Sequence, residues 1–187
     1  MLFVDGSNLL TELGVGLGIE IRSERPTKKA LQLACLTADK ALAELFSAGQ
    51  IGAHLTVRKY WFGSVQGSDE DMESKAEFLR SSGYEAVLFH KVKGRKEKGV
   101  DLAVAREMLI HGFHRNYDMA VLIAGDEDYL GLVGDLKRLG LVVAVAFYGS
   151  AALSRKLKLA SDAFALLQEP HAVHDNLAKA VLAERAA

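Results

Sequence analysis

The chain has 187 residues, of which 50% are hydrophobic, 25% are charged and only two are proline. This composition excludes a fibrous or disordered chain and predicts one domain whose core needs no disulfide or structural metal. The formal net charge of −1 excludes a surface that is basic throughout, so attraction to nucleic acid requires a local basic patch. One cysteine cannot form an internal disulfide, and no leader or membrane span is recognisable, so we expect a soluble, cytoplasmic protein that does not contact membranes.

The first apolar run, residues 1–4, leads into Asp5-Gly6-Ser7-Asn8. An apolar run that stops at an acid and a glycine predicts a strand with Asp5 at its carboxyl end. Asp5 and Asn8 could instead act only as turn formers or helix caps, because these residue types often end elements. The glycines at 14, 16 and 18 lack the spacing of a dinucleotide-binding loop, so residues 10–26 are predicted to form an irregular loop.

The next elements follow from apolar spacing and local turn residues. Pro26 is well placed to open a helix whose apolar positions continue to Phe46, and Cys35 among them is expected to be a core thiol and not a nucleophile. Residues 53–62 are rich in β-branched and aromatic types and predict a strand closed by Gly63. Ser68 and the three acids after it predict a capped helix start, not a calcium loop. Residues 84–89 predict another strand.

A concentrated basic segment follows that strand. Five cations fall within eight residues: Lys91, Lys93, Arg95, Lys96 and Lys98. Such charge runs are usually solvated loops. This one directly precedes Asp101 and a predicted helix through residue 109, and its position makes it a candidate functional segment. The helix dipole alone explains an acid in a first helical turn, so Asp101 by itself would be structural.

The apolar run 121–124 ends in the acidic turn Gly125-Asp126-Glu127-Asp128-Tyr129. It predicts a strand buried on both faces that delivers carboxylates to its carboxyl end, followed by a helix through residue 139. The alternation continues with a predicted strand over 141–147, a helix near 151–160 and a short strand over 162–167. From residue 171 the chain predicts an amphipathic helix that covers a sheet edge or contacts another subunit of a homo-oligomer. The histidine pairs at 111 and 114 and at 171 and 174 lack a third metal ligand.

Strands that alternate with helices predict an α/β fold: a mainly parallel central sheet with helices on both faces, in three layers. The carboxyl ends of its strands share one edge, where ligands of such folds collect. Asp5, Asp126 and Asp128 would project there, and Asp101 would join them from the start of its helix. Carboxylates gathered in this way need a counter-cation, and hard divalent ions such as Mg²⁺ or Mn²⁺ suit oxygen ligands.

Three motifs in this order resemble the NYN domain family of the PIN-like ribonucleases: Val4-Asp5-Gly6-Ser7-Asn8, Lys98-Gly99-Val100-Asp101 and Ala124-Gly125-Asp126-Glu127-Asp128-Tyr129. The resemblance covers residues 1–168 and leaves 169–187 as a helical tail. It implies a Rossmann-like PIN-type fold and metal-dependent ribonuclease chemistry, with Asn8 orienting a ligand or substrate. The catalytic, Mg²⁺- or Mn²⁺-binding acids that it implies are Asp5, Asp101, Asp126 and Asp128. Many relatives have Ser in place of Ala124 and Phe in place of Tyr129, and neither difference removes a carboxylate.

The hypothesis that follows is hydrolysis of an RNA phosphodiester by metal-activated water, with the basic segment attracting the phosphate backbone. One alternative is a non-catalytic NYN-like module that binds RNA or a regulatory partner and keeps the acids as a cation site. Another is a phosphoacceptor receiver domain, which requires two adjacent acids after the first strand and a lysine ending the last core strand. Asp5 has no acidic neighbour and the strand ends Phe147-Tyr148, so the sequence disfavours a receiver domain.

Overall fold

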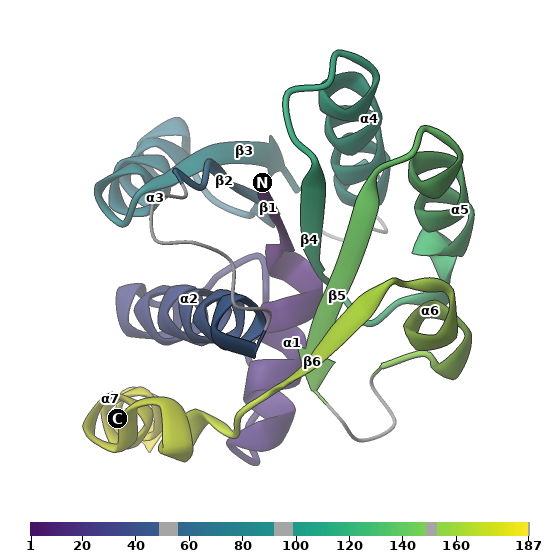
Figure 1. Ribbon diagram of the computed structural model, residues 1–187. Coiled ribbons are helices and arrows are strands. Elements are labelled where there is room, and N and C mark those ends of the chain that lie inside the picture. The colour runs from purple at the N-terminus through teal and green to yellow at the C-terminus, as the bar shows by residue number, and fades with distance from the viewer. Residues whose placement is uncertain (49–55, 92–98, 149–152, 187) are drawn as a thin grey trace.

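The protein is described by a computed structural model at residues 1–48, 56–91, 99–148 and 153–186. Six strands form one sheet in the order β3-β2-β1-β4-β5-β6, and each neighbouring pair is parallel (Figure 1). The strands are β1 (Leu2–Asp5), β2 (Lys59–Val65), β3 (Tyr84–His90), β4 (Met119–Ile123), β5 (Val142–Tyr148) and β6 (Ala163–Leu167). The helices are α1 (Gly6–Gly16), α2 (Lys28–Ala48), α3 (Asp69–Ser81), α4 (Val100–Phe113), the 3₁₀ turn η1 (Glu127–Tyr129), α5 (Leu130–Arg138), α6 (Arg155–Ala160) and α7 (Pro170–Ala186). The predicted α/β fold is therefore confirmed.

The strand order is that of a Rossmann sheet, and it determines where a ligand can bind. The chain builds outward from β1 to β3, returns to the centre of the sheet and builds outward again from β4 to β6. The direction reverses between β1 and β4, which pair in parallel with Val4 opposite Ile123. Connections leaving these two strands diverge to opposite sides of the sheet, so a crevice opens at their carboxyl ends.

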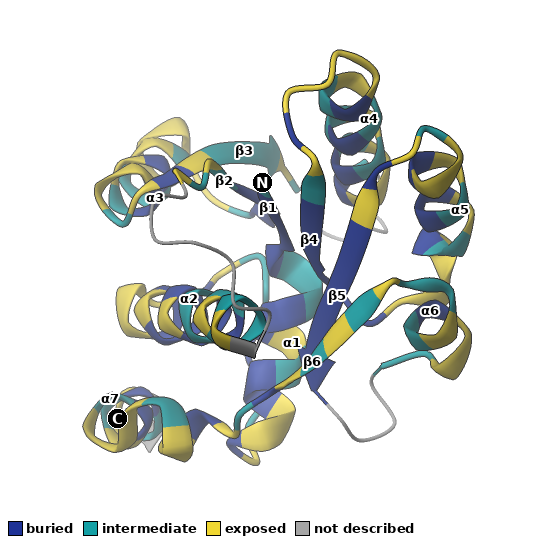
Figure 2. Ribbon diagram, viewed as in Figure 1, coloured by how far each residue is buried: buried dark blue, intermediate teal, exposed yellow. Residues whose placement is uncertain are grey.

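Two apolar layers cover the sheet, and alternate side chains of each central strand enter one or the other. Leu2 and Val4 pack with residues of α1, α2 and α7, whereas Phe3 packs with residues of α4, α5 and α6. Figure 2 shows the central strands buried and the outer helix surfaces exposed. All four residues of β1 are buried, so its last residue, Asp5, is presented from inside the core and not from a surface loop.

The predicted loop over residues 10–26 is wrong at residues 10–16, which belong to α1. Burial of Leu9, Leu10 and Leu13 against the core stabilises this helix despite its glycines. Close packing explains one of them, because a Cβ on Gly14 would lie 2.7 Å from the Ile19 carbonyl oxygen. The glycines were interpreted as loop formers, although the apolar spacing before them already suited a helix.

Other boundaries also differ from the predictions. β2 begins at Lys59 and continues through Gly63 to Val65, so Gly63 does not close it, and residues 53–55 lie outside the described residues. α6 begins only at Arg155, where the Ser154 side chain caps it. Ser68 caps α3 as predicted. None of the described helices is both long and apolar enough to span a membrane.

The C-terminal helix α7 packs against α2 of the same chain (Figure 1). Val181 is buried in the interface with α2, and Lys40 donates a hydrogen bond to the Ala172 carbonyl at 3.2 Å. An ion pair of 3.1 Å between Lys29 and Glu184 joins the two helices near the end of α7. The apolar side of the predicted tail helix therefore has a partner within this chain.

Candidate active site

Asp5 ends β1 as a buried carboxylate that accepts a hydrogen bond on each oxygen. The residue is 3% exposed; its Oδ1 accepts the Asn8 backbone N–H at 3.0 Å and its Oδ2 accepts the Tyr129 hydroxyl at 2.8 Å. A buried carboxylate is strongly unfavourable without such donors. The bond from Asn8 also caps α1, so the helix-capping role considered from the sequence is real and coexists with a place in the site.

Tyr129 brings a second carboxylate to the same point. Its hydroxyl oxygen lies 3.3 Å from Asp101 Oδ1, in the first turn of α4. One phenolic proton serves one acceptor at a time, and the shorter contact makes Asp5 the main one. Burial, and after it the charges of Asp5 and Asp101, raise the pKa of the Tyr129 phenol above its ordinary value. Tyr129 therefore stays neutral and remains a donor.

Asn8 joins the ends of the two central strands. Its side-chain Oδ1 accepts the Gly125 backbone N–H at 3.1 Å, which links the first turn of α1 to the acidic turn after β4. This bond crosses the point where the strand order reverses. The structure thus gives Asn8 a role in holding the backbone of the site, and its predicted contact with substrate stays a prediction.

The acids of the turn after β4 point in different directions. Asp126 Oδ1 accepts the Asp128 backbone N–H at 3.1 Å and caps η1, and both residues are exposed. Glu127 instead pairs with Lys156 at 2.7 Å, toward α6. That hydrogen bond to Lys156 is the main reason why the pKa of the Glu127 carboxyl is lowered.

A cleft of about 230 Å³ opens at these strand ends. Three of the four predicted acids line it, and Asp128 does not. The lining residues are Asp5, Ser7, Asn8, Thr11, Ser23, Gly99, Val100, Asp101 and Asp126. Ser7, Thr11 and Ser23, which line the cleft, were not predicted, and neither was the contact of the Tyr129 phenol with Asp5 and Asp101. These positions depend on helix and loop packing that no local motif records.

The acids fit an open site for a hard divalent ion better than a closed metal cage. Within the described part of the chain, no three His, Cys, Asp or Glu side chains are arranged to hold a metal ion. Mg²⁺ is usually held by one or two carboxylates and completed by water and substrate phosphate oxygens. Asp5 and Asp101, which approach one hydroxyl, and Asp126 on the same cleft supply donors of this chemical type.

Most of the predicted basic segment lies outside the described residues: Lys93, Arg95, Lys96 and Lys98. Lys91 is described and forms an ion pair with Glu24 at 3.6 Å. The chain resumes at Gly99, which lines the cleft directly before α4. The predicted contact of these five cations with a phosphate backbone stays a prediction.

A six-stranded parallel sheet flanked by helices, with carboxylates at its switch point, is an α/β architecture consistent with a PIN-like three-layer fold. The chain belongs to the NYN domain family, whose match covers residues 1–168. A solved structure of a Vibrio parahaemolyticus protein of unknown function has the same fold, with a TM-score of 0.58 and 15% identity over 90% of this chain and 92% of that chain. At that identity the likeness concerns the fold alone. No curated protein matches the chain.

Proposed function

We propose that this protein is a divalent-metal-dependent ribonuclease that hydrolyses RNA phosphodiester bonds in the acidic cleft. Membership of the NYN family supports a nuclease-like, RNA-related fold. One observation carries the proposal: the Asp5 and Asp101 carboxylates lie 2.8 and 3.3 Å from one hydroxyl, and Asp126 lines the same cleft. Acids far apart in the sequence are thus gathered where the fold places ligands.

Each residue has a role that follows from its contacts. A bound Mg²⁺ or Mn²⁺ would supply an activated water and charge neutralisation at the phosphate. Asp5 and Asp101 would hold it together with water and phosphate oxygens, and Asp126 would add negative charge on the same cleft. Asp5 is oriented by two hydrogen bonds, and Asn8 fixes Gly125 so that the turn carrying Asp126 keeps its place. Asp128, predicted to share in catalysis, would act at most from the rim, because its carboxylate is exposed and outside the cleft lining.

Cleavage of labelled single-stranded RNA with Mn²⁺ or Mg²⁺, and with EDTA as the metal-free control, tests the proposal. We expect Asp5→Asn and Asp126→Asn each to lower the rate by roughly 100-fold or more, because each removes a charge that would hold the ion. Asp128→Asn should cost less than tenfold by the same reasoning. Asp135→Asn is the matched control, because its carboxylate pairs with Arg138 on α5. Equal activity of wild type, Asp5→Asn and Asp126→Asn would contradict the proposal.

A second candidate is a non-catalytic module that binds RNA or a regulatory partner. Two observations favour it: no three metal-ligating side chains converge within the described residues, and the Tyr129 hydroxyl already lies within hydrogen-bond distance of two of the acids. This reading predicts RNA binding that EDTA does not alter and no cleavage with Mg²⁺ or Mn²⁺. The same assay, combined with a binding measurement in EDTA, distinguishes the two candidates.

A further inference from the structure

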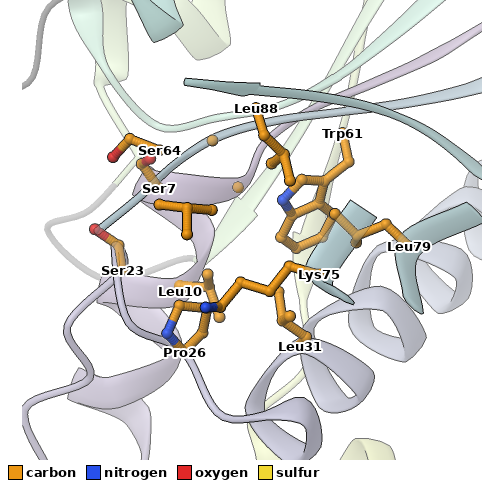
Figure 3. A pocket seen from close by; sticks show the side chains of 13 residues that line it. Ser7, Leu10, Ser23, Pro26, Leu31, Trp61, Ser64, Lys75, Leu79 and Leu88 are labelled. Atoms are coloured by element: carbon orange, nitrogen blue, oxygen red, sulfur yellow. The ribbon is translucent and has the colours of Figure 1, made fainter. Parts of the chain in front are cut away.

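A second, narrower pocket adjoins the acidic cleft and shares Ser7 and Ser23 with it. Its volume of about 10 Å³ corresponds to roughly one water molecule or one similarly sized oxygen atom. Figure 3 shows Ser7, Ser23 and Ser64 gathered at one end and the Trp61 ring at the other, with the Lys75 side chain ending near Leu10 and Pro26 in this view. The remaining walls are mostly apolar. The pocket is therefore a mainly apolar recess beside the cleft, with hydroxyl groups at one end.

One buried hydroxyl that lines this pocket has no hydrogen-bond partner among the described residues. Ser64 is 5% exposed, and its buried hydroxyl has no hydrogen-bond partner within the described residues. Trp61 is 1% exposed and lines the same pocket, and its indole N–H can only donate a hydrogen bond. Buried polar groups are rarely left unpaired, so the Ser64 hydroxyl in this recess indicates a hydrogen-bond partner that enters from outside.

Lys75 adds a positive charge to the same wall. It is half-buried and forms no ion pair with any described carboxylate. Its influence does reach Asp71: the pKa of that carboxyl is lowered mainly by the Ser68 backbone N–H and to a smaller extent by Lys75. Lys75 thus brings a positive charge to the pocket lining that no described carboxylate pairs with directly.

Gly6 brings the start of α1 directly against the Trp61 ring. A Cβ at residue 6 would lie 2.3 Å from the indole Nε1 and would collide with it. Because Gly6 follows Asp5, this contact places the pocket one residue from the acidic site. The pocket and the cleft are thus neighbours at the beginning of α1, with Ser7 and Ser23 lining both.

We propose that this pocket is a phosphate subsite that receives one oxygen of an RNA backbone phosphate adjacent to the phosphate in the acidic cleft. The RNA part of this inference rests on the proposed function. The chemistry selects an anion, because Trp61 and Lys75 only donate and the unpartnered Ser64 hydroxyl can donate. The volume admits a single oxygen, which leaves the rest of the phosphate at the mouth formed by Ser7 and Ser23. Two adjoining sites for phosphate oxygens match the repeating phosphates of a single strand.

The chain contains one tryptophan, so the Trp61 indole N–H gives a single resonance in a ¹H–¹⁵N spectrum. Metal-free protein would be titrated with inorganic phosphate at constant ionic strength. We expect a saturable shift of that resonance. Lys75→Met should weaken phosphate binding by roughly tenfold or more, and Ser64→Ala by a smaller factor, because a charged donor contributes more than a neutral one. Lys158→Met is the matched control, because its ammonium lies over the Phe164 ring near α6.

With RNA as substrate, Lys75→Met should raise KM by roughly tenfold and leave kcat within a factor of about two, as expected for a contact made equally in the ground and transition states. The subsite would be overturned, even if RNA is cleaved, if phosphate does not shift the indole resonance or shifts it equally in wild type and Lys75→Met. A phosphate response that depends on Lys75, without any metal-dependent cleavage, would overturn the nuclease function and leave the phosphate site standing.

Discussion

Tyr129→Phe removes the one hydroxyl that lies between Asp5 and Asp101. The ring itself is 2% exposed and packs in the core, so phenylalanine keeps the packing and loses only the donor. Asp5, 3% exposed, would keep its bond from the Asn8 N–H and lose the one from the phenol. A hydrogen bond to a charged group contributes about 1.5–3 kcal/mol, so we expect the free energy of unfolding to fall by about 2 kcal/mol.

Tyr117→Phe is the matched control. Tyr117 is 6% exposed and belongs to the same apolar layer, but its hydroxyl donates to the neutral Met108 carbonyl at 2.7 Å. A neutral hydrogen bond contributes about 1 kcal/mol, so this variant should lose roughly half as much stability. Both variants would be unfolded with urea at neutral pH without divalent ions, with fluorescence of the single tryptophan as the signal.

Mn²⁺ binding, measured by calorimetry, separates a role in the site from a role in stability. Because Tyr129 orients Asp5 and approaches Asp101, we expect Tyr129→Phe to bind Mn²⁺ roughly tenfold more weakly, as is typical when a partner of a ligating carboxylate is lost. Tyr117→Phe should bind Mn²⁺ like wild type. The reasoning is refuted if the two variants lose equal stability and bind the ion equally well.

Further predictions concern packing and the thiol. Gly112→Ala would place a Cβ 2.7 Å from Leu141 Cδ1, so overpacking should cost about 1–3 kcal/mol in urea unfolding. Gly134 lies in helix α5, and no atom lies within 4 Å of a Cβ added there. Gly134→Ala should therefore raise the free energy of unfolding by about 0.4–1 kcal/mol. Equal effects of the two substitutions would contradict the packing described. Burial, and after it the charge of Asp39, raise the pKa of the Cys35 thiol to about 12. A thiol-specific reagent at pH 8 should therefore label Cys35 slowly in the native protein and completely in urea. Rapid labelling without denaturant would be inconsistent with a core thiol.

Local pattern was enough to predict the fold class and the position of two acids. Apolar runs that stop at an acid and a glycine place Asp5 and Asp126 at strand ends whatever the strands pair with. Alternation of strands and helices then predicts a parallel sheet whose carboxyl ends share an edge. The helix over 10–16 was missed because burial of its leucines outweighs the low helix propensity of its glycines.

Tertiary structure alone decided how these groups meet. The strand order places β1 beside β4, and only then can Asn8 accept the Gly125 N–H and the Tyr129 hydroxyl lie between Asp5 and Asp101. The recess around Trp61 and Lys75 likewise exists because β2, α3 and the start of α1 pack together. Sequence spacing determines which face of an element a side chain occupies, whereas contacts between distant segments depend on how the whole core closes.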